Sequence, residues 1–174
     1  MNGIGYIVSG SEFYSIAADG TNQLLGDGIT GFAPISMDGN GLEIVIVNGE
    51  FGYSYLLADG TFEQISDPSF VPSNTVTVIN SIFAFDWPGT NKFFISNVLD
   101  GRSYDALDFS SAESSPDFVN AVRNRNGLLM VFGSKTIEPW DNTGASSFPF
   151  ARLKGGTIDR GVESSLAIEV EDSS

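Results

Sequence analysis

Carboxylates are the side chains of this sequence that could do chemistry, because it contains no His and no Cys. A Ser-His-Asp or Cys-His arrangement and a zinc site built on imidazole or thiolate are therefore excluded. Catalysis would need a pair of acids across a cleft, as in glycosidases. The candidates near corresponding turns or strands are Glu12, Glu50, Asp86 and Glu138. Because sequence spacing brings no two of them together in space, we predict that the chain is not an enzyme and assign no catalytic residue.

Two other features bear on ligand binding. Residues 36–41 (SMDGNG) begin like a calcium loop, but Leu42 stands at the next ligand position and the closing Glu of such a loop is absent. We interpret this string as a turn. Trp87 and Trp140 could form a platform for a sugar, although we favour buried aromatic residues at strand ends. We predict no metal site and no cofactor.

A tight-turn signal recurs along the chain and indicates the elements that would position these residues. It consists of Asp followed by Gly or by Asn-Thr-Gly, after a run of aromatic and branched residues, which is typical of a β-hairpin. The aspartates are separated by 40, 41 and 41 residues: Asp19, Asp59, Asp100 and Asp141. A hairpin signal repeated every 40–45 residues or so indicates β-propeller blades.

Two further turn signals precede most of these turns, at the spacing expected for short antiparallel strands. Three turns per period delimit four strands, and the clearest set is predicted at residues 32–36, 43–47, 51–58 and 62–66. Residues 44–47 are apolar on both faces, as in a strand that lies between neighbouring blades. In the third unit no glycine separates the first two strands, which are predicted to merge across residues 75–85.

The sequence therefore predicts an all-β, β-propeller-like fold of about four four-stranded antiparallel blades, which could be part of a larger propeller. The predicted single domain covers residues 1–174, with blades at about 1–28, 29–70, 71–112 and 113–156 and a final strand at 163–170. That strand would complete the first blade, which opens without its earlier strands. A β-sandwich is the alternative, but it would not explain why the turn chemistry repeats in phase.

The charge of the chain is acidic and unevenly distributed. The net charge is −14, and no Lys or Arg precedes Lys92. Such a surface repels a polyanion, so sequence-specific binding of DNA or RNA is not expected. Because no apolar stretch is long enough for a membrane helix and residues 1–10 lack the features of a signal peptide, we expect the chain to stay in the cytoplasm, at least initially, with no membrane partner.

One longer string carries a resemblance to a known family. Residues 131–138 (VFGSKTIE), followed by Trp140 and Thr143-Gly144-Ala145, resemble the packaged-DNA stabilisation proteins, or tail hubs, of short-tailed bacteriophages. Three further stretches are similar to the same family in the same order: Val47-Asn48-Gly49 with Asp59-Gly60-Thr61, Phe93-Phe94-Ile95-Ser96 before Leu99-Asp100, and Leu153-Lys154-Gly155. The resemblance spans about Gly5 to Gly161.

The resemblance implies a structural protein of the virion tail, assembled in the host cytoplasm and without catalytic residues. Such a hub lies below the portal and its adaptor ring, closes the DNA exit channel until genome ejection, and helps to attach the tail needle or other tail proteins. Its subunits would form a homo-oligomeric ring whose acidic lumen lets DNA pass without specific binding.

The sequence also departs from that family, because it stops soon after Val170 where family members continue for a long way. It would then be a fragment, a truncated gene product or a compact relative. Two other functions remain open from the sequence. One is a carbohydrate-binding or carboxylate glycosidase β-propeller, and the other is a protein-interaction propeller with no viral role.

Overall fold

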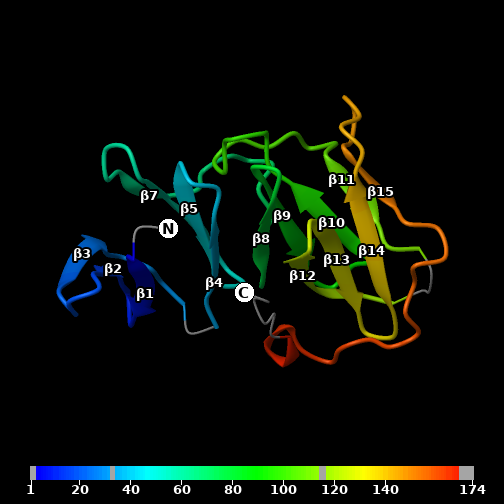
Figure 1. Cartoon of the computed structure of the whole chain (residues 1–174), viewed down its shortest axis with the longest axis horizontal. Coiled ribbons are helices and arrows are strands. Elements are labelled where there is room, and N and C mark those ends of the chain that lie inside the picture. Colours follow the sequence, from blue (N-terminus) through cyan, green and yellow to red (C-terminus); the bar gives the residue numbers. More distant parts are fainter. Residues whose placement is uncertain (1–2, 32–33, 114–116, 169–174) are drawn as a thin grey trace.

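The computed structural model describes residues 3–31, 34–113 and 117–168, which form four antiparallel sheets. The sheets follow one another in chain order across the molecule (Figure 1). Within each sheet every strand pairs with its neighbour in sequence. The prediction of an all-β, propeller-like fold is confirmed.

The strands divide among the sheets as three, four, four and four. Sheet 1 contains β1 (Gly5–Ser9), β2 (Glu12–Ile16) and β3 (Asn22–Gly26), and sheet 2 contains β4 (Ser36–Gly39), β5 (Glu43–Val47), β6 (Gly52–Leu56) and β7 (Phe62–Gln64). Sheet 3 contains β8 (Val76–Ile79), β9 (Ile82–Trp87), β10 (Lys92–Ile95) and β11 (Phe109–Ser111), and sheet 4 contains β12 (Val119–Arg125), β13 (Leu128–Gly133), β14 (Ile137–Asn142) and β15 (Phe150–Arg152). Over the described residues, sheet 1 has three strands, one fewer than each of the other sheets.

The recurring turn signal lies before the last strand of every sheet, where a side-chain oxygen accepts a backbone hydrogen bond from two residues further on. The donors are the N–H groups of Thr21 (2.9 Å to Asp19), Thr61 (3.0 Å to Asp59), Arg102 (3.0 Å to Asp100) and Gly144 (2.9 Å to Asn142). Matching the sheets by this turn aligns β1 with β5, β9 and β13. The strand that sheet 1 lacks therefore corresponds to β4, β8 and β12.

The first strand of sheet 2 was predicted at residues 32–36, and this boundary is wrong. The strand begins at Ser36, while Phe32 and Ala33 lie outside the described residues. The turn falls after Gly39, because the Asn40 Oδ1 accepts hydrogen bonds from the N–H groups of Leu42 (2.9 Å) and Glu43 (3.0 Å). Asp38 and Gly39 consequently belong to the strand rather than to the turn.

The predicted merger of two strands across residues 75–85 is also wrong. β8 ends at Ile79 and β9 begins at Ile82, and the two residues between them have φ angles of 50° (Asn80) and 64° (Ser81). Two successive left-handed residues make a hairpin turn that normally favours Gly at the second position. Asn adopts the left-handed conformation more readily than most residues. The turn is therefore formed by Asn80 and Ser81, without the glycine by which a turn would be predicted from the sequence.

Apolar clusters fill the space between neighbouring sheets. Phe13 of sheet 1 packs with Ile44 and Ile46 of sheet 2, and Val45 and Val47 on the other face of the same strand pack with sheet 3. All residues of β5 are buried, as predicted for a strand between two sheets. A third cluster between sheets 3 and 4 includes Phe93, Leu129, Val131 and Trp140.

The predicted final strand at residues 163–170 is wrong over residues 163–168, and Glu169 and Val170 lie outside the described residues. A 3-10 helix, η1 (Ser165–Ala167), replaces it. The chain before η1 docks on sheet 4 rather than on sheet 1, because Val162 donates to the Gly133 carbonyl (2.9 Å) and accepts from the Asn120 amide (2.6 Å). Among the described residues, no helix is long and apolar enough to cross a bilayer.

Candidate functional site: buried carboxylates and the inner strands

The four candidate catalytic acids lie on four different sheets. Glu12 begins β2 in sheet 1, Glu50 lies in the turn before β6 in sheet 2, Asp86 lies on β9 in sheet 3, and Glu138 lies on β14 in sheet 4. Asp86 and Glu138 are buried, Glu12 is half-buried and Glu50 is exposed. This distribution reflects the repeat, since each acid belongs to a separate unit.

Asp86 accepts hydrogen bonds at both oxygens from the segment that leads into β8. Its Oδ1 accepts from the N–H (2.6 Å) and the hydroxyl (2.7 Å) of Thr75, and its Oδ2 accepts from the backbone and side-chain amides of Asn74 (3.4 and 3.2 Å). Burial raises the pKa of Asp86, and these hydrogen bonds offset part of the rise. The carboxylate therefore fixes the start of β8.

The inner strands β4, β8 and β12 lie side by side and are joined by a repeated contact. On β4, Ser36 Oγ accepts from the N–H of Val76 (3.1 Å) and Asp38 Oδ2 from that of Val78 (2.8 Å). The same contacts link the next pair of sheets, where Thr75 and Thr77 accept from the N–H groups of Val122 (3.0 Å) and Asn124 (2.9 Å). Alternate side chains of one inner strand thus satisfy the backbone of the next.

Asp38 belongs to this row, which explains the calcium-like string. Its Oδ1 accepts from the N–H of Gly39 (2.8 Å), while its Oδ2 accepts from Val78 on the neighbouring sheet. Asn40 caps the following turn. The oxygens of the string are therefore occupied by backbone donors, and among residues 3–31, 34–113 and 117–168 no cluster of three potential metal-ligating side chains was found.

Glu43 is a structural acid that the sequence did not indicate as a site. It is 2% exposed, and its carboxylate accepts from the N–H of Gly101 (2.6 Å) in sheet 3 and from the hydroxyl of Ser54 (2.9 Å). The Tyr104 hydroxyl donates to the Gly101 carbonyl (2.5 Å), and burial raises the pKa of Tyr104 well above its usual value. The sequence signal that could have indicated a buried acid is the position of Glu43, a charged residue directly before the apolar residues 44–47.

Asp117 was also missed by the sequence reasoning. Its Oδ2 accepts from the N–H groups of Lys135 (2.6 Å) and Thr136 (2.9 Å) and so holds the turn between β13 and β14. A Cβ atom at Gly133 would lie 2.5 Å from this oxygen, so only glycine fits there. The glycine of the GSKT string is thus required by the acid that packs against it.

The tryptophans are packing residues rather than an exposed platform. Trp140 is 7% exposed and contacts Phe93 edge-on, with 4.9 Å between ring centroids. Trp87 packs against Phe109, and the Lys92 ammonium lies 5.2 Å from the Trp87 ring. Trp140 is buried in one apolar cluster, as predicted for a strand-end aromatic, whereas Trp87 is half-buried and packs against a different cluster.

Two basic side chains accompany the buried acids. Arg152 lies 3.6 Å from the carboxylate of Glu138, which is 1% exposed. Burial lowers the pKa of Arg123 on β12, while the charges of Asp86 and Asp38 partly offset this effect. Buried acids and nearby cations of this kind serve to join strands and sheets. The four candidate acids themselves lie on four different sheets.

Known proteins share both sequence and fold with this chain. A family model described as "Bacteriophage P22 Gp10, beta-propeller", of the type named Phage_stabilise, matches residues 1–172. The chain belongs to this phage family. A curated relative from the family, the "Tail hub protein gp10" of Salmonella phage P22, is 29% identical over 154 residues, which are 82% of this chain and 31% of the relative.

Solved structures of low sequence identity share the fold of this chain. A chain of a "Mitotic Checkpoint Complex" superposes with a TM-score of 0.61 at 14% identity, over 87% of this chain and 47% of that one. Hsv2 of Kluyveromyces lactis gives a TM-score of 0.60 at 12% identity, over 92% of this chain and 49% of that one. The chain spans about a third of the tail hub relative and about half of each solved chain. The carbohydrate alternative is not favoured.

Proposed function

We propose that this chain is a structural, non-enzymatic part of a phage tail hub that stabilises the packaged genome. The observation that carries the proposal is the family match over residues 1–172, together with the tail hub relative. The buried acids support it, because Asp86 and Glu43 bind backbone and hydroxyl donors within and between sheets and so keep the sheets rigid. Rigid sheets suit a protein that must withstand the pressure of packaged DNA.

The hub would lie between the portal-adaptor complex and the tail needle or other tail proteins, in virions assembled in the host cytoplasm. Its subunits would surround the exit channel as a ring, through which DNA passes without specific contacts. The net charge of −14 supports this passage, since phosphate binding depends on Lys and Arg and none precedes Lys92.

A genetic experiment tests the hub proposal. In the phage whose genome encodes the chain, a nonsense codon early in the gene is expected to give DNA-filled heads that lose their genome, measured as DNA that becomes sensitive to nuclease. Supplying the protein in trans is expected to restore protection, and peptides of the chain should be found in purified virions. Mutant virions that retain nuclease-resistant DNA would contradict the proposal.

A binding experiment tests the passage of DNA separately. The purified chain is expected to show no measurable binding to duplex or single-stranded DNA at low salt, the condition that most favours phosphate contacts. Fluorescence anisotropy of labelled DNA measures this directly. Binding that weakens as salt is added would contradict the proposed non-adhesive channel while leaving the tail location untouched.

A further inference from the structure

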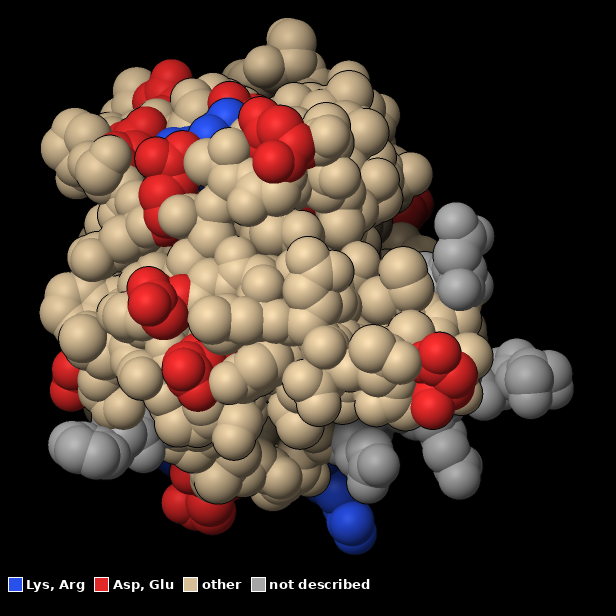
Figure 2. Space-filling model, turned by 90° about the vertical axis from the view of Figure 1, so that its left-hand side faces the viewer, with Lys and Arg blue, Asp and Glu red and all other residues tan. Residues whose placement is uncertain are grey.

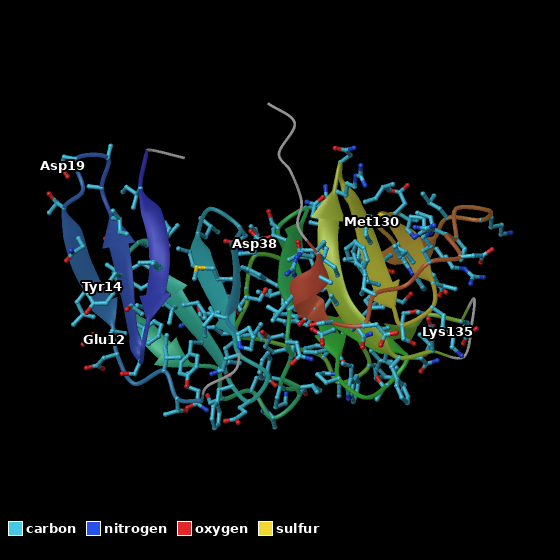
Figure 3. All side chains as sticks on the ribbon, turned by 90° about the horizontal axis from the view of Figure 1, so that it is seen from below. Glu12, Tyr14, Asp19, Asp38, Met130 and Lys135 are labelled. Carbon is cyan, nitrogen blue, oxygen red and sulfur yellow. The ribbon has the colours of Figure 1, made fainter. Side chains whose placement is uncertain are left out.

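The connection between the third and fourth strands is longer in sheet 3 than in the other sheets, where it forms a loop of residues 96–108. Its counterparts cover residues 17–21, 57–61 and 143–149. Long loops on a rigid scaffold commonly carry binding residues. We call the end of the sheets formed by these four connections the upper rim, because Figure 3 shows Asp19 of this end at the top of sheet 1 and Glu12 toward the bottom.

Hydrogen bonds and apolar packing anchor the 96–108 loop to the sheets. The N–H of Leu99 donates to the Ser81 carbonyl (2.9 Å), and the N–H of Gly101 donates to the Glu43 carboxylate (2.6 Å). The Tyr104 ring belongs to the apolar cluster between sheets 2 and 3. The loop is therefore preorganised, so a partner that bound it would lose little free energy in ordering it.

The anchored loop presents aliphatic side chains to solvent. Leu107 is 79% exposed, Val98 is 63% exposed and Leu99 is 50% exposed. Leu99 has a φ of 63°, a left-handed conformation that costs a non-glycine residue about 1–2 kcal/mol. Backbone strain of this kind persists where the surroundings hold it, and it is concentrated at functional sites. The loop is thus held in a shape that exposes these side chains.

Two leucines of sheet 2 extend this apolar surface. Leu42 and Leu57 are both exposed, and the N–H of Leu57 donates to the Leu42 carbonyl (2.9 Å). Leu42 directly precedes Glu43, the residue that binds the 96–108 loop through Gly101. The exposed aliphatic residues of sheets 2 and 3 therefore lie at neighbouring places on the upper rim.

A cavity of about 400 Å³ lies beside the loop, between sheets 3 and 4. Its apolar lining includes Ile82, Ile95 and Val98. The polar lining includes the carboxylate of Asp108 and the amides of Asn97 and Asn142, and of the described residues that line the cavity none is basic. The volume is in the range of about 300–1,000 Å³ that is usual for sites that bind small ligands or single side chains.

The polar lining of the cavity suits a cation. Burial and, to a lesser degree, the charge of Asp105 raise the pKa of Asp108. Both effects disfavour the ionised carboxylate, and a cation bound beside it would offset them. Asn97 donates from its side-chain nitrogen to Ser103 Oγ (2.7 Å), and its side-chain oxygen can accept a hydrogen bond from a ligand.

Arginine is the cation that matches this combination of polar and apolar groups. Its planar guanidinium has five donors, which suit the two oxygens of Asp108 together with a side-chain amide oxygen. A guanidinium is also less strongly hydrated than an ammonium group, so it loses less on entering a cavity. The methylene groups of an Arg side chain can pack on Ile82, Ile95 and Val98.

The charge of the upper rim also favours a basic partner. The four connections contain the acids Asp19, Asp59, Asp100, Asp105 and Asp108 and one basic residue, Arg102. Arg102 is paired with Glu63 (2.9 Å), and the nearby strand ends of sheet 4 add one charge of each sign, Arg125 and Asp141. Figure 2 shows the molecule from the sheet 1 side, where acidic side chains outnumber basic ones.

We propose that the 96–108 loop and the cavity beside it bind a protein segment in which an Arg lies next to aliphatic residues. The Arg side chain enters the cavity and contacts Asp108, and its aliphatic neighbours cover Val98, Leu99 and Leu107. Nucleic acid is repelled by the acids of the rim, and a second copy of a chain with a net charge of −14 is disfavoured for the same reason.

The site depends neither on the number of sheets in the ring nor on the proposed hub function. Further sheets at either end of the arc would pack on sheets 1 and 4, and the 96–108 loop lies on sheet 3 at the rim.

The cavity is tested with the isolated side chain. N-acetyl-arginine methylamide is titrated at low salt into the isotope-labelled chain, and the amide resonances are followed by NMR. Saturable shifts are expected at Asn97 and Asn142, with a dissociation constant on the order of 1 mM. The citrulline analogue has nearly the same shape and no charge, and it is expected to bind at least roughly tenfold more weakly.

Two variants separate the cavity from the general charge of the rim. Asp108→Asn keeps the shape of the side chain and is expected to remove the saturable shifts. Asp141→Asn is the matched control, because Asp141 is an exposed acid of the same rim that is not part of the cavity lining. It is expected to leave the dissociation constant unchanged.

The aliphatic part of the site is tested with short random peptides selected on the immobilised chain. The peptides that bind are expected to contain Arg with Leu, Ile or Val close to it in sequence. Leu99→Asn is expected to weaken a selected peptide roughly tenfold, and the loop is retained because Asn accepts the left-handed conformation. Phe118→Asn is the control, since Phe118 is exposed just before β12, at the opposite end of the sheets.

The proposal is overturned when the arginine compound gives no saturable shifts with the wild type, or when the citrulline analogue binds equally well. It is also overturned by selected peptides that lack Arg, or that bind Asp108→Asn or Leu99→Asn as tightly as the wild type. Circular dichroism and a thermal melt establish that each variant is folded. Hub function is measured independently by retention of DNA in virions.

Discussion

At the scale of single residues, the buried acid Asp86 organises its surroundings through four hydrogen bonds from Thr75 and Asn74. We expect Asp86→Ala to lower the free energy of unfolding by about 2–4 kcal/mol, because buried donors that lose a charged acceptor are left unsatisfied. Urea unfolding measures the effect. Glu50→Ala at an exposed turn serves as the control and is expected to change stability by about 0.5 kcal/mol or less.

The same residue predicts a dependence on pH. Burial raises the pKa of Asp86 above its usual value of 3.8, so the folded protein binds this proton more tightly than the unfolded chain. The resulting stabilisation is fully present below pH 3.8 and is lost as the pH rises through the folded pKa. We expect the stability difference between wild type and Asp86→Ala to decrease from acidic to neutral pH. A difference that grows with pH in urea titrations would contradict this assignment.

Part of the residue-level picture follows from sequence and part does not. Burial of Trp140 at a strand end could be predicted, because an aromatic residue in an apolar strand favours the core. The role of Glu43 could not be predicted from the sequence. Its hydrogen-bond partner Gly101 is 58 residues away and contacts it only when sheets 2 and 3 pack together. The role of Asp117 could not be predicted for the same reason, because its partner, the N–H of Lys135, is 18 residues away in the sequence.

At the scale of elements, the turn between β8 and β9 shows how a hairpin forms without glycine. Ser81 has a φ of 64°, a conformation that costs non-glycine residues about 1–2 kcal/mol. We expect Ser81→Gly to raise the free energy of unfolding by about 0.5–1 kcal/mol after the entropy cost of glycine is included. Ser15→Gly, within β2, is the control and is expected to lower it by about 0.5–1 kcal/mol. Chemical denaturation of both variants gives the comparison.

Strand order was more predictable than strand ends. The Asp turns mark the last hairpin of each sheet, because a side-chain oxygen that accepts a nearby backbone N–H stabilises the turn locally. The end of β4 was misplaced because Asp38 and Gly39 have turn-forming types, although Asp38 is bound by Val78 of the next sheet. The strand predicted at residues 163–170 was wrong for a similar reason. The conformation of this segment depends on a tertiary contact, the hydrogen bond of Val162 with Gly133 of sheet 4.

At the scale of the whole molecule, glycine sets how closely sheets 2 and 3 approach each other. A Cβ atom at Gly101 would lie 2.5 Å from Val45 and 3.0 Å from the Phe83 ring. We expect Gly101→Ala to lower the free energy of unfolding by about 1–3 kcal/mol through overpacking. Gly5→Ala is the matched control, because the nearest atom is 3.8 Å away, and it is expected to be neutral or to stabilise by up to about 1 kcal/mol.

The pairing of every strand with its neighbour in sequence has a consequence for how the protein is made. Each sheet consists of hairpins whose partners are close along the chain, and short-range contacts of this kind form quickly. A sheet can therefore be completed while later residues are still on the ribosome, and synthesis of about 5–20 residues per second leaves seconds between successive sheets. A contact that joins two sheets, such as that of Asp38 with Val78, can form only once both sheets have been synthesised. We therefore expect the protein to be built by stepwise addition of sheets to a growing stack.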